Sequence, residues 1–173
     1  TVPIFLTGFM GSGKSYWGRR IAVSLDMPFY DLDAYIIEQT GKSIPELFAE
    51  HGEAGFRKME HEYLMGLMEQ PASVVSTGGG TPCFFDNMEQ MNRFGRTIYL
   101  RIPIDVLAAR LSKEMHRRPL LAGLNSEDLP GFIEKLLEKR ALFYEMAQQT
   151  PEWSGVEALY FERILEAATM NKS

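Results

Sequence analysis

The sequence is poor in several features that define large classes of proteins. Cys83 is its single cysteine among 173 residues, which excludes an internal disulfide and a thiolate metal cluster. The three histidines, His51, His61 and His116, lack the spacing of metal ligands, and we expect them at or near the surface. Basic residues are not in excess, and the net charge of -5 argues against nucleic acid as the main partner.

Long apolar runs are also absent. No stretch approaches the ~20 apolar residues that are needed to cross a bilayer. A content of 45% hydrophobic and 24% charged residues is typical of one globular domain, here covering residues 1–173. An apolar strand expected at residues 3–7 leaves no room for a signal peptide. We therefore expect a cytoplasmic protein with no membrane partner.

One octapeptide stands out, GFMGSGKS at residues 8–15, which matches the phosphate-binding pattern G-x-x-x-x-G-K-S. Its glycines let successive backbone N–H groups turn toward one anion. Lys14 adds a positive charge near the β- and γ-phosphates of a nucleotide, and the Ser15 hydroxyl can bind Mg²⁺. The loop lies between an apolar strand and a segment of helical spacing, residues 16–25, as phosphate binding at a helix N-terminus requires. The sequence therefore predicts a nucleotide-binding protein.

Apolar segments alternate with segments of helical periodicity along the chain. The strands are expected at residues 3–7, 28–31, 73–76 and 97–101, and the clearest helices at 16–25, 106–111 and 131–147. This alternation predicts an α/β fold with a central parallel sheet of about five strands and helices on both faces.

The fifth strand has two candidate positions. Residues 148–151 follow the last clear helix but are polar and end in proline, whereas residues 158–161 lie within a stretch of helical spacing, 155–168. We favour a helix over the second stretch and a short or degenerate fifth strand.

Three chemically suggestive segments follow the first three strands: residues 8–15, Asp31-Leu32-Asp33 and residues 77–80. Parallel sheets bind ligands at the carboxyl ends of their strands, so the segments should meet at one edge. Asp31 and Asp33 are expected on one face of extended backbone. Beside a phosphate loop, one carboxylate suits Mg²⁺ and the other a proton from an attacking hydroxyl. The structural alternative is that Asp33 caps a helix over residues 34–39.

Other segments allow both a structural and a functional interpretation. Arg57 and Glu60 are one helical turn apart, which suits an ion pair or an arginine fork that Glu60 holds for a substrate carboxylate. Gly78, Gly79 and Gly80 either form a flexible turn or let a ligand approach bare backbone. The stretch between Leu111 and Leu124, charged and then apolar, suits a mobile lid or a solvated loop.

Taken together, these residues resemble the shikimate kinase family. The match runs in order over about residues 2–147. It includes the phosphate loop, Asp31 with Asp33, Phe56-Arg57-Lys58-Met59-Glu60, the three glycines, Arg118-Pro119-Leu120-Leu121 and Arg140. The resemblance implies a three-layer P-loop kinase fold with an acceptor-binding subdomain over about residues 32–60 and a lid over about 111–124.

The resemblance also implies a reaction, the transfer of the γ-phosphoryl group of ATP to the 3-hydroxyl of shikimate in aromatic amino-acid biosynthesis. ATP and shikimate would be the partners of a monomer, with Mg²⁺ as cofactor. Catalytic roles would fall to Lys14, Asp33 and Arg118, and metal binding to Ser15 and Asp31. Nucleotide binding would use Gly11, Ser12, Gly13, Lys14, Ser15, Tyr16, Arg110 and Arg118. Shikimate binding would use Asp33, Arg57, Gly78, Gly79, Gly80 and Arg140.

The chain departs from the family pattern at three places. Tyr16 replaces a small hydroxylated residue after the loop serine, Leu142 replaces a proline after Arg140, and the Pro151-Glu152-Trp153 segment is atypical of the region near adenine. Two alternatives stay open: a related kinase of the gluconate kinase type, and a relative that binds shikimate or nucleotide without turnover. The second would be expected to have lost Lys14, Asp33 or Arg118.

Overall fold

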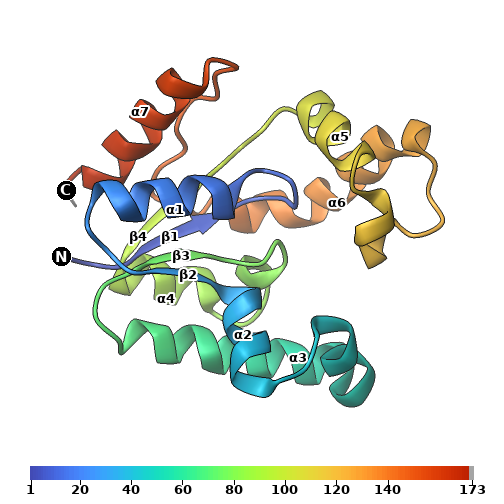
Figure 1. The fold of residues 1–173 in the computed structure, drawn as a ribbon, viewed down its shortest axis with the longest axis horizontal. Helices are drawn as coiled ribbons and strands as arrows, with labels where there is room; N and C mark the ends of the chain where they lie inside the picture. The colour runs from blue at the N-terminus through green and yellow to red at the C-terminus, as the bar shows by residue number, and fades with distance from the viewer. Residues whose placement is uncertain (172–173) are drawn as a thin grey trace.

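The structure is a computed structural model that describes residues 1–171. Its centre is a parallel sheet of four strands in the order β2-β3-β1-β4 (Figure 1). The strands are β1 (Ile4–Thr7), β2 (Phe29–Asp31), β3 (Val74–Ser76) and β4 (Arg96–Tyr99). The helices are α1 (Lys14–Ser24), α2 (Leu32–Thr40), α3 (Ile44–Met68), α4 (Asn87–Phe94), α5 (Ile104–Ser112), α6 (Leu129–Tyr144) and α7 (Glu157–Thr169). The predicted α/β class and the four predicted strands are confirmed.

Helices cover both faces of the sheet, because alternate strand residues point to opposite faces. Ile4 and Leu6 of β1 belong to a core that α1 and α7 complete, whereas Phe5 between them belongs to a second core with α3 and α4. The result is a three-layer arrangement, and Figure 1 shows α1 and α4 on opposite sides of the strands.

The fifth strand is reduced to one bridge between Ile98 and Gln149. Gln149 donates to the carbonyl of Thr97 at 3.1 Å and accepts from the N–H of Tyr99 at 2.9 Å. Pairing stops there because the next residue that should donate is Pro151, which has no N–H. The expected degenerate strand is therefore confirmed, and so is the helix expected near the C-terminus, which is α7.

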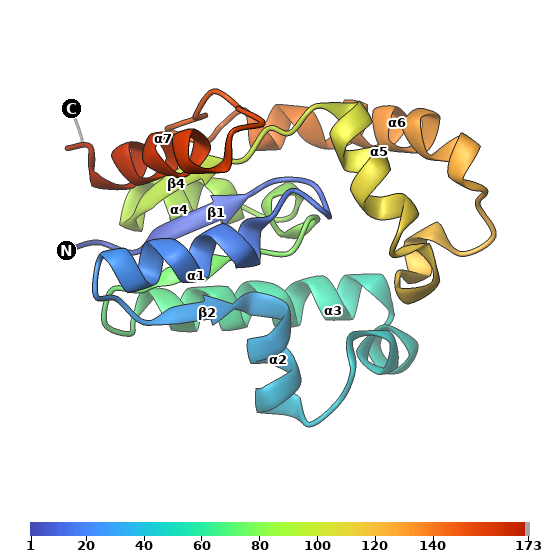
Figure 2. The same cartoon turned by 45° about the horizontal axis from the view of Figure 1, so that its top comes forward.

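The segments on either side of the phosphate loop come from distant parts of the chain. Figure 2 shows α5 and the short turns after it on one side, and α2 with the first part of α3 on the other.

Helix α3 begins at a capping box formed by Ser43 and Glu46 and bends at Gly52, which has a φ of 67°. Within residues 1–171, no helix is both long and apolar enough to cross a membrane.

Candidate active site

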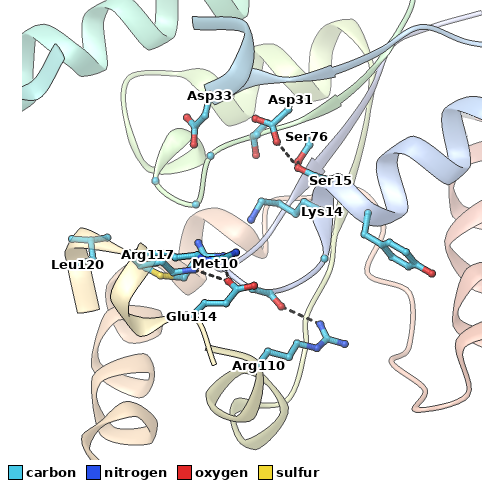
Figure 3. Close-up of a pocket in the computed structure, with 18 of the residues that line it drawn as sticks. Met10, Lys14, Ser15, Asp31, Asp33, Ser76, Arg110, Glu114, Arg117 and Leu120 are labelled. Atoms are coloured by element: carbon cyan, nitrogen blue, oxygen red, sulfur yellow. Dashed lines mark hydrogen bonds and ion pairs between the residues drawn. The ribbon is translucent and has the colours of Figure 1, made fainter. Parts of the chain in front are cut away.

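A cavity of about 1470 Å³ lies where β1, β2 and β3 end (Figure 3). Its walls include every site residue expected from the sequence except Ser12, which is buried within the phosphate loop. Ile44, Phe48 and Phe56 also line it. The sheet edge therefore brings together the segments that the sequence singled out.

The phosphate loop curls back on itself with Gly11 and Gly13 in left-handed backbone, at φ of 78° and 91°. Gly13 is the residue before α1, so the N-terminus of that helix faces the cavity. The Lys14 ammonium donates to the carbonyls of Gly8 and Phe9 at 2.7 and 3.0 Å. Burial lowers the pKa of Lys14 to about 8, while the nearby Asp33 carboxylate opposes the shift.

Oxygen atoms of three side chains converge beside the loop. The Ser15 hydroxyl donates to the Asp31 carboxylate, and its Oγ lies 3.1 Å from Oγ of Ser76. Mg²⁺ prefers such oxygen ligands and usually keeps water and substrate phosphate in its other positions. The residues present therefore suit Mg²⁺.

The two aspartates differ in backbone, contrary to expectation. Asp31 ends β2 in extended backbone, but Asp33 lies in the first turn of α2. The structural alternative for Asp33, a helix cap, does not apply: Asp31 is the N-cap, and its Oδ1 accepts the N–H of Ala34 at 3.1 Å. The helix begins at Leu32, two residues earlier than expected, because the last strand residue, Asp31, already serves as its N-cap.

Asp33 remains free of the capping role and lines the cavity. Burial raises the pKa of its carboxyl to about 6, and the negative charges of Glu60 and Asp31 add to the shift, while Lys14 and Arg57 oppose it. A carboxylate with a pKa near the working pH is suited to accept a proton from a substrate hydroxyl.

Arg57 and Glu60 form the expected i, i+3 ion pair, with Nη1 and Oε1 3.0 Å apart. Glu60 is almost fully buried, and the guanidinium of Arg57 lies 4.3 Å from the ring centre of Phe84. Arg57 also lines the cavity. The two interpretations of this pair are therefore compatible: an ion pair holds an arginine that faces the cavity.

The three glycines after β3 make room for side chains of the site. A Cβ on Gly78 would lie 3.3 Å from Oδ1 of Asp33. A Cβ on Gly79 would lie 3.1 Å from Nη1 of Arg140, and one on Gly80 would lie 2.6 Å from Nη2 of Arg57. Three consecutive glycines thus bring one carboxylate and two guanidinium groups close to a single turn.

Arg110 lies within α5 and Arg118 comes after it, and both donate hydrogen bonds to other groups of the protein. Nε and Nη2 of Arg118 both donate to Oε2 of Glu114, at 3.1 and 2.8 Å. Arg110 donates to the carbonyl of Gly11 at 3.0 Å. The stretch that contains Arg118 consists of short 3₁₀ turns, Met115–Arg117 and Pro119–Leu121.

The side chain of Tyr16 leads away from the phosphate loop. Its hydroxyl donates to the carboxylate of Glu157 on α7 and accepts from Nη1 of Arg20 at 3.0 Å. The backbone of Tyr16 stays in the first turn of α1, but its hydroxyl has protein partners 4 and 141 residues away.

Some residues of the site were not singled out from the sequence. Glu114 was identifiable from its i, i+4 spacing to Arg118, and Ser76 from its place at the end of β3. Thr81 and Phe84, which contact Glu60 and Arg57, had no signal beyond their closeness to the glycines.

Comparison with known proteins agrees with this geometry. A family model described as shikimate kinase matches residues 10–168. A shikimate kinase of Bacteroides thetaiotaomicron is 51% identical over 147 residues, which cover 85% of this chain and 84% of that protein. The chain belongs to the shikimate kinase family.

Solved structures of the family share the whole fold. A shikimate kinase from Bacteroides thetaiotaomicron has a TM-score of 0.89 and 46% identity, covering 95% of this chain and 97% of the other. A shikimate kinase from Acinetobacter baumannii, solved in complex with shikimate, has a TM-score of 0.84 and 34% identity, covering 95% and 91%. A gluconokinase from Sinorhizobium meliloti, at 21% identity and a TM-score of 0.54, shares the fold alone.

Proposed function

We propose that this protein transfers the γ-phosphoryl group of ATP to the 3-hydroxyl of shikimate, giving shikimate 3-phosphate and ADP. The observation that carries the proposal is the arrangement around the glycine turn, in a chain of the shikimate kinase family. Asp33, Arg140 and Arg57 approach Gly78, Gly79 and Gly80 in that order, in the cavity that the phosphate loop also lines.

Shikimate is a small carboxylic acid with ring hydroxyls, and this turn offers a partner for each feature. Arg57 and Arg140 bind the carboxylate, because two guanidinium groups give a strong and oriented anchor for one anion. Asp33 accepts a hydrogen bond from the 3-hydroxyl and takes its proton during transfer. Backbone N–H groups of the three glycines serve the remaining hydroxyls. We assign residues 32–60, which carry Asp33 and Arg57, to an acceptor-binding subdomain.

The phosphate side of the reaction uses charge rather than covalent chemistry, because phosphoryl transfer depends mainly on positioning and neutralisation. Backbone N–H groups of Gly11 and Gly13 bind phosphate oxygens, and Lys14 neutralises the transferred group. Ser12 supports this loop from within, since its backbone N–H donates to the carbonyl of Phe9 at 3.1 Å. Tyr16 contributes its backbone N–H, and Arg110 lies beside the nucleoside. Ser15 and Asp31 hold Mg²⁺, which neutralises charge on the β- and γ-phosphates when it is bound.

Arg118 completes the charge balance from the lid, residues 111–124. Its guanidinium is paired with Glu114, so it must exchange that carboxylate for the phosphoryl group as the lid closes. The pair is partly exposed and its residues are four positions apart, and such exposed pairs contribute little to stability. The exchange of Glu114 for the phosphoryl group therefore costs little free energy.

We further propose that the protein is a cytoplasmic monomer, as expected from the sequence.

A coupled assay of ADP release tests the proposed function. The folded protein is incubated with ATP and Mg²⁺ and with shikimate, with gluconate or without an acceptor. Release that depends on shikimate and is near background in the other two reactions is expected. Release that shikimate does not change, or that gluconate stimulates more, would contradict the proposal.

A further inference from the structure

A closed ring of hydrogen bonds ties the glycine turn to helix α3, and the roles assigned above do not use it. Thr81 Oγ1 donates to Oε2 of Glu60 at 2.9 Å, and the Thr81 carbonyl accepts from Nδ2 of Asn87 at 2.9 Å. Asn87 Oδ1 lies 2.6 Å from Nδ1 of His61. Since His61 follows Glu60 on α3, the ring closes through the helix.

The donor and acceptor roles around this ring are consistent. A carbonyl oxygen can only accept, so Asn87 presents its amide nitrogen to Thr81 and its oxygen to His61. That oxygen can also only accept, so Nδ1 of His61 carries the proton. Thr81 and Asn87 are fully buried and Glu60 is 1% exposed. Hydrogen bonds in such surroundings hold their partners firmly, because an unpaired group would be costly.

Glu60 connects this ring to the acceptor site. Its two carboxylate oxygens have different partners: Oε1 accepts from Nη1 of Arg57 at 3.0 Å, and Oε2 accepts from Thr81. The Thr81 hydroxyl therefore fixes the rotation of the carboxylate that orients Arg57. Thr81 does not line the cavity itself, and its hydroxyl donates to Glu60, so the loss of that hydroxyl acts first on Glu60.

We propose that Thr81 is a positioning residue for acceptor binding, whose hydroxyl holds Glu60 in the orientation that keeps the Arg57 guanidinium ready for the substrate carboxylate. The inference rests on the proposed function, because it assumes that Arg57 binds the carboxylate of shikimate. Without the hydroxyl, Oε2 of Glu60 loses a donor and the carboxylate can turn away from Arg57.

Two variants of Thr81 separate its hydroxyl from its shape. Thr81→Val keeps the branched side chain and removes the hydroxyl, whereas Thr81→Ser keeps the hydroxyl and removes a methyl group. A hydrogen bond to a charged partner is worth enough for Thr81→Val to raise the KM for shikimate about tenfold or more. In Thr81→Val, kcat and the KM for ATP should stay within about twofold of the parent, because only the orientation of the Glu60 carboxylate has been lost. Thr81→Ser keeps the hydroxyl and should therefore have the parent KM for shikimate.

Thr97→Val is a matched control. Thr97 is also fully buried, and its hydroxyl is hydrogen-bonded to Asn92, but it lies near the start of β4, away from the cavity. Its loss should lower the melting temperature and leave the KM for shikimate unchanged. Circular dichroism of each variant measures folding, and Thr81→Ala replaces Thr81→Val if the valine variant does not fold.

The outcomes distinguish this inference from the proposed function. A parent enzyme without shikimate-dependent turnover would refute the proposed function, and the inference with it. An active parent whose Thr81→Val variant keeps its KM for shikimate within about twofold would refute the inference alone. So would equal impairment of the serine and valine variants, or a Thr97→Val variant with the same rise in KM.

Discussion

The guanidinium of Arg57 lies so close to the backbone of Gly80 that a Cβ there would be 2.6 Å from Nη2. Gly80 has φ of -92° and ψ of -14°, a conformation that any residue can adopt. The glycine therefore leaves the space that the Arg57 guanidinium occupies, whereas its own backbone angles do not call for glycine. This contact joins the turn after β3 to α3 at the point where we place the acceptor carboxylate.

Gly80→Ala should consequently displace Arg57 and weaken acceptor binding. The added methyl group overpacks the turn, and the free energy lost when Arg57 is displaced is large enough to raise the KM for shikimate about tenfold or more. The KM for ATP should change little. Gly66→Ala is the control, because Gly66 lies on the same helix as Arg57 and a Cβ there meets nothing within 4 Å. It should raise the free energy of unfolding by about 0.5–1 kcal/mol without changing either KM. An equal KM for shikimate in both variants would contradict the steric explanation.

Arg57 and Arg118 should fail in different ways when each is replaced by alanine. Arg57→Ala removes an anchor that is used before and during transfer, so the KM for shikimate should rise strongly. Arg118→Ala removes a charge that acts on the phosphoryl group, so kcat should fall ~10³-fold or more while acceptor binding is largely retained. Steady-state kinetics with each substrate varied in turn measure both effects. The division of roles fails if the two variants show the same pattern.

Asp33→Asn keeps the shape of the side chain and removes the proton acceptor. Turnover should collapse while ATP binding, measured by calorimetry, survives. A variant that stays within a few-fold of the parent in kcat would show that Asp33 is not the base.

The pH dependence of the parent enzyme should be bell-shaped. The pKa of Asp33 is raised to about 6, so kcat/KM should fall below about pH 6, where the carboxyl becomes protonated and cannot accept a proton. The pKa of Lys14 is lowered to about 8, so a second fall should begin above about pH 8, where its positive charge is lost. An acidic limb near pH 4, typical of an unperturbed aspartate, would contradict the role of burial.

Tyr16→Thr should improve nucleotide binding. The Tyr16 hydroxyl is engaged by Glu157 and Arg20, so it is not directed at a phosphate, whereas a threonine hydroxyl at the first turn of α1 is short enough to stay beside the loop. We expect the KM for ATP to fall several-fold, since a hydrogen bond to a charged group is gained. Tyr16→Phe is the control and should leave this KM unchanged. A fall in the phenylalanine variant instead would mean that the hydroxyl itself hinders ATP.

Much of this fold could be predicted from local patterns. Each strand coincides with one of the short, mainly apolar segments between the helical stretches, and the degenerate fifth strand follows from a polar segment that ends at Pro151. The boundary between β2 and α2 could not be predicted, because Asp31 serves at once as strand end, helix cap and partner of Ser15. Spacing alone assigns one role to one residue, so it offered only Asp33 as an alternative cap and did not identify the cap at Asp31.

The site was predictable to the extent that it is encoded in contiguous motifs. Contacts between residues far apart in sequence were not, and the bond from Thr81 to Glu60, 21 residues away, is the clearest case. The predicted role of the three glycines was also incomplete. Their sequence suggests room for a ligand, whereas the fold shows that the glycines also leave space for Asp33, Arg140 and Arg57 while still lining the cavity.

The most direct test of the account identifies the product. The protein is incubated with ATP, Mg²⁺ and shikimate, and the phosphorylated product is examined by two-dimensional ³¹P–¹H nuclear magnetic resonance. The account predicts one phosphomonoester whose phosphorus couples to the proton on C3 of the shikimate ring, formed in equal amount to ADP and absent with Asp33→Asn. Phosphorus coupled to a proton on another ring carbon, or ADP formed without any phosphorylated shikimate, would contradict it.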